Sequence, residues 1–177
     1  EEWKFILGSW SVWIYQIMYS IMTSNSTVIT IHNRLYKGKN CHLIDSSTLD
    51  EVWLKNFKKV KLDRIRFLYV GRINPEKGIY EFLEIFEKTK IDAEFSIVGD
   101  SSKIKDSKNK NIKLIGYVSD KQSLIDIYDA HNILILPSYT EGQPHVVEES
   151  LARRRPVIVF EDIAHIIKTR KGIFVAK

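Results

Sequence analysis

Hydrophobic residues beyond about position 65 fall into short apolar runs separated by longer amphipathic stretches. The apolar runs predict strands at residues 66–70, 94–98, 112–115, 133–136, 156–160 and 173–175. The stretches between them predict helices at residues 78–88, 121–130, 144–152 and 162–168. Short apolar strands that alternate with helices of about ten residues are typical of βαβ units. The pattern therefore predicts an α/β domain with a parallel sheet and helices on both faces.

The chain before residue 65 follows a different pattern. Residues 5–33 contain no Asp, Glu, Lys or Arg. An apolar stripe recurs there at three- and four-residue steps, at Ile6, Trp10, Trp13, Ile17 and Ile21. Serine and glutamine residues interrupt the run, so we expect a helix that is buried against protein or lies at a membrane surface, rather than one that spans the bilayer. A short strand at 27–31 follows, and then a polar stretch with a helix at 49–57.

Composition and charge narrow the class of protein. With 44% hydrophobic and 28% charged residues among 177, the chain has the composition of an ordinary globular protein. Cys41 is the only cysteine, so an internal disulfide and a cysteine-based metal site are excluded, which suits a reducing cytosol. The net charge of +5 comes largely from lysine-rich patches at 55–61 and 103–110. These indicate either a solvated surface or attraction to anionic lipids or phosphorylated substrates. Nucleic-acid binding is not expected, because no recognition motif accompanies the charge.

The loop after the first strand of the predicted sheet carries two cations between glycines. Arg72 and Lys77 lie there, with Gly71 before them and Gly78 after them. Gly71 lets a ligand approach the backbone, and the following helix begins with unpaired N–H groups. The loop is therefore a candidate phosphate site, although a solvated charged loop would have the same composition. It is neither the G-x-G-x-x-G turn of dinucleotide-binding dehydrogenases nor the G-x-x-x-x-G-K-[ST] loop of NTPases. The main sequence evidence for either class of enzyme is therefore missing.

A second loop places two carboxylates eight positions apart across the start of a helix. After the strand at 133–136 the chain continues Glu141-Gly142-Gln143-Pro144-His145-Val146-Val147-Glu148-Glu149. Glu141 falls in the loop, and Glu149 lies about a turn and a half into the helix, which is roughly 7 Å at 1.5 Å rise per residue. Two acceptors at that spacing could hold separate hydroxyl groups of one extended ligand. A turn followed by an ordinary acidic first helical turn explains the same residues.

The glycines at other strand ends connect these loops. Gly99 and Gly116-Tyr117-Val118 also follow predicted strands, so all these motifs share the carboxyl-terminal rim of one sheet. In this order, and with Pro156-Val157-Ile158 closing the series, residues 65–177 resemble the donor-binding half of the retaining GT-B glycosyltransferases of family 4. The resemblance implies a Rossmann-like C-terminal domain of a GT-B fold. It also implies a reaction that transfers a sugar from a nucleotide-diphosphate sugar with retention.

The resemblance assigns roles to particular residues. Arg72 and Lys77 would bind the donor diphosphate and stabilise it as a leaving group, while Glu141 would contact sugar hydroxyls and Glu149 the ribose. Backbone amides around Gln143 to Val146, a segment that follows Gly142 and contains Pro144 and His145, would approach the phosphates. Gly71 would allow close approach, and Gly116 and Tyr117 would border the base. His145 is a candidate phosphate contact, whereas His131 and His165 are expected to be structural. No metal or other cofactor is expected.

The resemblance also divides the chain and points to partners. Residues 1–36 would be the last helix and strand of an acceptor domain, 37–64 the connection, and 65–177 a truncated donor domain. The acceptor would be a glycan or a lipid-linked acceptor in lipopolysaccharide or capsule synthesis. The protein would be cytoplasmic or peripheral at the inner face of the plasma membrane. We expect the chain alone to turn over little. A nucleotide-sugar epimerase and a non-catalytic binding module remain alternatives.

Two departures from the family pattern concern the second half of this domain. Family members often carry glycine where Arg154 stands, and a Gly-Gly pair where residues 161–165 stand. A side chain at position 154 would either crowd the turn between helix and strand or point to solvent. Contacts from the 161–165 loop to a donor sugar are left open.

Overall fold

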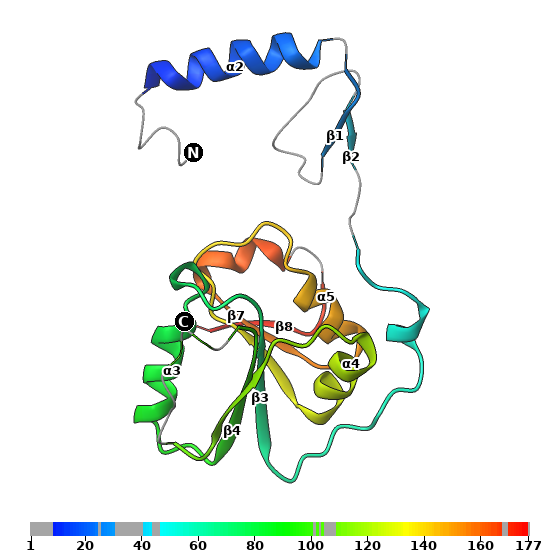
Figure 1. Cartoon of the computed structure of the whole chain (residues 1–177), viewed down its shortest axis with the longest axis vertical. Coiled ribbons are helices and arrows are strands. Elements are labelled where there is room, and N and C mark those ends of the chain that lie inside the picture. Colours follow the sequence, from blue (N-terminus) through cyan, green and yellow to red (C-terminus); the bar gives the residue numbers. More distant parts are fainter. Residues whose placement is uncertain are drawn as a thin grey trace. The chain divides into compact units, whose positions relative to one another are not determined.

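The computed structural model divides the chain into two compact units, Glu1–Ser47 and Thr48–Lys177, each described here by itself (Figure 1). The described residues are 9–24, 26–30, 41–43, 47–100, 109–167 and 170–176, together with Ser102 and Ile104. In the first unit, helix α2 spans Ser9–Thr23, and strand β1 (Val28–Thr30) pairs in parallel with β2 (Cys41–Leu43). The division into 1–36, 37–64 and 65–177 stays a prediction.

Helix α2 carries much of the predicted apolar stripe on an exposed surface. Trp13, Ile17 and Ile21 are exposed, while Ile6 lies outside the described residues. Within the described part of the chain, no helix combines the length and hydropathy needed to cross a bilayer. Strand β2 was missed by the sequence prediction, because three residues are too few to show an alternating pattern.

Six parallel strands form the sheet of the second unit, in the order β5-β4-β3-β6-β7-β8. Their bounds are β3 Ile65–Val70, β4 Ala93–Val98, β5 Ile112–Gly116, β6 Ile133–Leu136, β7 Val157–Phe160 and β8 Ile173–Ala176. Each boundary lies within one residue of its prediction, so the predicted parallel, Rossmann-like α/β fold is confirmed. The strand order reverses between β3 and β6, and the crevice outside the carboxyl ends of strands at such a point is where sheets of this kind bind ligands.

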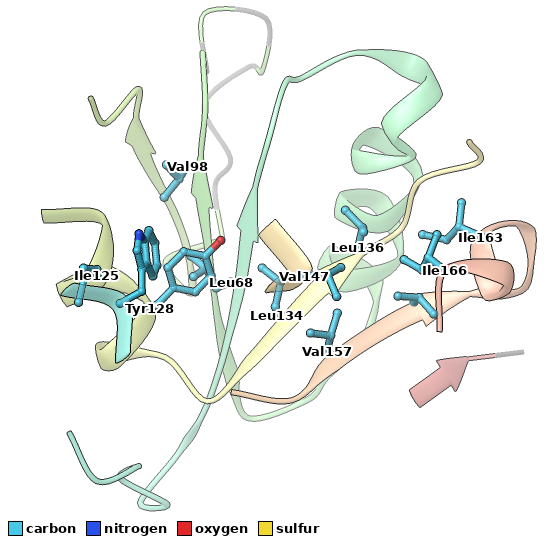
Figure 2. Close-up of a cluster of buried hydrophobic side chains, with 12 residues drawn as sticks. Leu68, Val98, Ile125, Tyr128, Leu134, Leu136, Val147, Val157, Ile163 and Ile166 are labelled. Carbon is cyan, nitrogen blue, oxygen red and sulfur yellow. The ribbon is translucent and has the colours of Figure 1, made fainter. Parts of the chain in front are cut away.

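Helices cover both faces of this sheet. Helix α3 (Ile79–Lys88) packs on one face, where Leu83 and Phe86 meet Tyr69 and Phe95. Helices α4 (Lys121–Ala130) and α5 (His145–Ala152) pack on the other face (Figure 1). Figure 2 shows the cluster on that second face, which extends from Ile125 and Tyr128 to Ile163 and Ile166. Successive side chains of a central strand point to opposite faces of the sheet, so alternate residues pack into the hydrophobic clusters on the two faces.

Two predicted helices form 3-10 turns instead. The prediction of a helix at 49–57 is wrong: only Glu51–Leu54 (η1) is helical, because the carbonyls of Trp53, Lys55 and Asn56 accept hydrogen bonds from Arg153 rather than from the next turn. The predicted helix at 162–168 is a 3-10 helix, η4, over Glu161–Ile166. The backbone is kinked at Ile163, which has φ −115° and ψ 16°, and the side chains of Ile163 and Ile166 are both buried.

Helix α5 ends in a left-handed turn that explains the departure at position 154. Arg154 has φ +59°. Its N–H donates to the Leu151 carbonyl at 2.9 Å, and the Arg155 N–H donates to the Ser150 carbonyl at 2.9 Å. These two bonds form a Schellman motif, whose left-handed position favours glycine. Arg154 therefore occupies a glycine conformation, and its guanidinium stacks over the Phe57 ring at 3.9 Å from the centroid.

Candidate functional site

The loops after β3 and β6 are in contact at the point where the strand order reverses. The Tyr139 N–H donates to the Glu76 carbonyl at 3.1 Å. Gly78, with φ +61°, lies so close to the second loop that a Cβ there would be 2.1 Å from the Pro137 carbonyl oxygen. Only glycine fits this approach, so its place after Lys77 is explained by packing between the two loops. The contact brings the cationic loop and the glutamate loop together.

Lys77 and Glu141 form an ion pair across this contact. The Lys77 Nζ and Glu141 Oε1 atoms are 2.7 Å apart, and the side chains are only 15% and 11% exposed. The hydroxyl of Ser138, which is fully buried, donates to the same Oε1 atom at 2.8 Å. The Glu141 carboxylate is therefore held by one cation and one neutral donor. Sequence reasoning had marked Lys77 and Glu141 separately but did not find the role of Ser138.

A cavity of about 480 Å³ lies along the rim of the sheet at the ends of β3, β4 and β5, and its lining does not include Lys77 or Glu141. Its walls come from the carboxyl ends of β3, β4 and β5 and the loops after them. The lining residues are Val70, Gly71, Arg72, Ile73, Asn74, Val98, Gly99, Asp100, Tyr117, Val118 and Leu124. The structure thus brings together three predicted site residues from two motifs, Gly71, Arg72 and Tyr117. Gly116 is the last residue of β5 and comes directly before Tyr117 in the chain.

Arg72 is an exposed cation at the edge of the cavity. Within the described residues its guanidinium has no hydrogen-bond or ion-pair partner. Its backbone is fixed instead, because the Tyr69 hydroxyl donates to the Arg72 carbonyl at 2.6 Å. Burial, together with the charges of Glu141 and Glu76, raises the pKa of Tyr69, so this phenol stays a donor. The loop therefore combines a fixed backbone with a free charged side chain.

Glu149 accepts a hydrogen bond from the core of the domain. The hydroxyl of Tyr128, a fully buried residue of α4, donates to Glu149 Oε2 at 2.8 Å. Burial raises the pKa of Glu149, whereas the Tyr128 bond and the nearby His145 oppose that rise. Burial also raises the pKa of Tyr128 well above its ordinary value, so the phenol is the donor in this bond. The carboxyl is half-buried, with its orientation set by one phenol.

The start of α5 holds the remaining predicted residues. Gly142 is exposed, Gln143 donates to Glu148 Oε1 at 3.2 Å, and Pro144 is the buried residue that caps the helix. His145 opens the helix, and its Nδ1 atom is buried without a hydrogen-bond partner among the residues that the structure describes. The Val146 carbonyl lies 3.5 Å from the Tyr128 hydroxyl. The functional roles assigned to these residues stay predictions.

Comparison with known proteins identifies the family. The family model described as "Glycosyl transferases group 1" matches residues 64–177, more than half of the chain. The chain belongs to this glycosyltransferase family.

Two curated relatives and one solved structure illustrate the similarity. The chain is 39% identical over 97 residues to the putative teichuronic acid biosynthesis glycosyltransferase TuaC of Bacillus subtilis, covering 55% of this chain and 25% of TuaC. It is 28% identical over 149 residues to the capsular polysaccharide biosynthesis glycosyltransferase CapM of Staphylococcus aureus, covering 76% of this chain and 37% of CapM. The chain therefore spans less than half the length of either curated relative.

The solved structure supports the fold. HepE of Anabaena, solved in complex with UDP and glucose, has a TM-score of 0.67 at 11% identity over 92% of this chain and 52% of HepE. At that identity the likeness concerns the fold alone. The predicted resemblance to glycosyltransferases is thus confirmed at the level of the family, while retention of configuration stays a prediction.

In this member of the family the segment before the sheet is held by buried arginines. Arg153 pairs with Asp129 through two bonds, of 3.0 and 2.7 Å, and donates to the carbonyls of Trp53, Lys55 and Asn56. Arg155 donates to the carbonyls of Tyr128, Asp129, Arg153 and Lys58. Both arginines are at most 2% exposed. Sequence reasoning missed this cluster, because three consecutive arginines ordinarily indicate a solvated surface.

The sequence predicted structural roles for both His131 and His165, and only His131 is buried. His131 is 9% exposed, its Nδ1 lies 2.6 Å from the Ile127 carbonyl oxygen, and burial lowers its pKa. His165 is exposed, and its Nε2 lies 3.0 Å from the Glu141 carbonyl oxygen. It belongs to η4, where other family members often carry the glycine pair. Within the described residues no group of three or more potential metal ligands occurs; the expectation that no metal is needed stays a prediction.

Proposed function

We propose that this rim is the donor site of a glycosyltransferase that moves a sugar from a nucleotide-diphosphate sugar to a glycan or lipid-linked acceptor. The observation that carries the proposal is the Lys77–Glu141 ion pair at the point where the strand order reverses, beside the cavity lined by Arg72. A cation for phosphate and a carboxylate for hydroxyls meet there. A ligand that carries both a diphosphate and a sugar matches this combination of groups.

The proposed diphosphate site consists of Arg72 and Lys77 with the start of α5. When the bond between the sugar and the diphosphate breaks, negative charge accumulates on the leaving phosphate oxygen. Cations and helix N–H groups near that oxygen stabilise the charge and lower the barrier. Arg72 has its guanidinium free for a bidentate contact, and Lys77 supplies a second positive charge. This arrangement supports departure of a diphosphate without a metal ion.

The proposed contacts to the donor hydroxyls are Glu141 for the sugar and Glu149 for the ribose. The Glu141 carboxyl is largely buried and the Glu149 carboxyl is half-buried, and each has an oxygen held by a neutral hydroxyl donor, Ser138 or Tyr128. We propose that they orient hydroxyl groups and do not transfer protons. Tyr117 and the apolar end of the cavity, with Val118 and Leu124, would face the base.

The pathway and the acceptor are proposed from the relatives. TuaC is named for teichuronic acid synthesis and CapM for capsular polysaccharide synthesis. We propose that this glycosyltransferase likewise builds a bacterial cell-surface polysaccharide, capsular or lipopolysaccharide, at the cytoplasmic side of the membrane, with retention of configuration. Because the chain spans only 25% of TuaC and 37% of CapM, we expect it to bind donor and to transfer little sugar by itself.

A binding screen tests the proposal. The chain is mixed with UDP-, GDP-, ADP- and CMP-linked sugars, and binding is followed by ligand-detected NMR. We expect one nucleotide class to bind and Lys77→Met to weaken it by about tenfold. Lys88→Met is a matched control, since Lys88 is an exposed lysine at the end of α3 that pairs with Glu84. Absence of binding to every donor would contradict the proposal. Conversion of free donor without acceptor would instead favour an epimerase.

A further inference from the structure

Tyr128 connects the candidate ribose-binding carboxylate to the hydrophobic core. Its ring is fully buried in the cluster of Figure 2, on α4, while Glu149 lies on α5. The hydroxyl donates to Glu149 Oε2 at 2.8 Å. Within the described residues no group donates to the other oxygen, Oε1. One carboxylate oxygen is thus occupied by the protein, and the other is left for a ligand.

The Tyr128 ring has little freedom to move. The Trp53 ring packs against it edge-on, with centroids 5.7 Å apart and an interplanar angle of 70°. Trp53 is 3% exposed, and its carbonyl accepts a hydrogen bond from Arg153 at 2.8 Å. The Tyr128 carbonyl accepts another from Arg155 at 3.2 Å. Backbone and ring are therefore fixed by contacts that do not involve Glu149.

A neutral phenol is suited to this role. A cation would neutralise the carboxylate and compete with ligand hydroxyls, whereas a phenol donates one hydrogen bond and leaves the negative charge in place. A hydrogen bond to a charged group is also stronger than one between neutral groups. The bond therefore orients Glu149 and favours its ionised form, which a half-buried carboxyl needs in order to accept hydrogen bonds from two ribose hydroxyls.

We propose that Tyr128 is a positioning residue that orients Glu149 to accept hydrogen bonds from the ribose of the donor. This inference rests on the proposed function, since it takes Glu149 to be a donor contact. Tyr128 itself touches no ligand and acts only through the carboxylate. The consequence is specific: loss of the phenol hydroxyl weakens recognition of the nucleoside part of the donor and leaves recognition of the diphosphate unchanged.

The test compares two probes on two backgrounds. Binding of UDP, GDP and ADP, and of inorganic pyrophosphate, which has no ribose, is measured by calorimetry for wild type, Tyr128→Phe, Glu149→Gln and the double variant. We expect Tyr128→Phe to weaken the nucleoside diphosphate that binds wild type by about tenfold and pyrophosphate by less than about twofold. In the Glu149→Gln background the same change should have less than about a twofold effect.

A control and a ligand-free measurement complete the test. Ser150→Ala removes a buried hydroxyl from the same helix, one that donates to the Arg155 carbonyl, and is expected to leave both affinities unchanged. In the ligand-free chain, carboxyl NMR should show a higher pKa for Glu149 in Tyr128→Phe than in wild type, because the phenol bond lowers it. An unchanged pKa, an equal loss for pyrophosphate, or a persistent loss in the Glu149→Gln background would overturn the inference while the proposed function stands. Failure of wild type to bind any nucleoside diphosphate would overturn both.

Discussion

Lys77 and Glu141 neutralise each other across the loops after β3 and β6, with Nζ and Oε1 2.7 Å apart. In the proposed complex, a group of the ligand would take the place of each residue's present partner. Phosphate would compete with Glu141 for Lys77, and sugar hydroxyls would compete with Lys77 for Glu141. The ligand-free pair therefore keeps two largely buried charges compensated until a ligand that carries both groups arrives.

The first prediction concerns the effect of Glu141→Gln on two probes. Removing the carboxylate charge frees Lys77, so a nucleoside diphosphate without sugar should bind as well as to wild type or up to about threefold more tightly. The additional affinity that the sugar provides should be lost, because the neutral amide of the variant is a weaker acceptor for the sugar hydroxyls than the Glu141 carboxylate. Calorimetric titration with the diphosphate and its sugar conjugate measures both effects. Equal weakening of the two ligands would contradict this division of roles.

The second prediction concerns Ser138→Ala. The Ser138 hydroxyl is fully buried and donates to Glu141 Oε1 at 2.8 Å, so its removal leaves the carboxylate with Lys77 alone. We expect the free energy of unfolding to fall by about 1 kcal/mol. Binding of the sugar conjugate should weaken more than binding of the diphosphate. Urea denaturation and the same titrations check this; Ser123→Ala, at an exposed helix start, is the matched control for loss of a serine hydroxyl that bonds a carboxylate.

The sequence predicted the sheet better than it predicted the site. The strands were found because buried parallel strands are continuous apolar runs, and Lys77 and Glu141 because each lies in a loop at the end of such a run. The contacts of Ser138 and Tyr128 could not be found, because they depend on how loops and helices distant in the chain pack together. The same holds for Arg153, whose carbonyl partner in Trp53 is 100 residues away. A charged residue can be buried only beside groups that pair with it, and a local sequence pattern does not show which distant residues those are.

The third prediction tests the arginine cluster. Arg153→Met leaves the Asp129 carboxylate buried without its bidentate partner and frees the carbonyls of Trp53, Lys55 and Asn56. We expect a loss of roughly 3 kcal/mol in the free energy of unfolding. Trypsin should cut faster at Lys55 and Lys58 at temperatures where the sheet is still folded. Arg170→Met serves as the control, since Arg170 pairs with Glu148 and not with this segment. Unchanged cleavage in Arg153→Met would contradict the proposed anchoring.

The fourth prediction concerns pH. Burial raises the pKa of Glu149 in the folded chain above its value in the unfolded chain. The folded state therefore binds the proton more tightly, and this contribution to stability is present below the unfolded pKa and is lost as the pH rises through the folded pKa. Glu149→Gln removes the titration while keeping an acceptor for Tyr128. It should gain stability relative to wild type at pH 7 and not at pH 4. Urea denaturation at the two pH values measures the difference; an equal difference at both would contradict the shift.

The last prediction uses the left-handed residue at the end of α5. Arg154 has φ +59°, a conformation that costs a side chain about 1 kcal/mol and glycine nothing. Its guanidinium stacks over Phe57, a contact worth roughly 0.5 kcal/mol at an exposed position. Arg154→Gly should therefore raise the free energy of unfolding by about 0.5 kcal/mol. In a Phe57→Ala background, where the stacking is already absent, the gain should rise to about 1 kcal/mol. Because Arg154 makes no contact with the candidate donor site among the described residues, nucleotide affinity should be unchanged in both backgrounds. A loss of stability on substitution by glycine would show that the stacking outweighs the backbone cost.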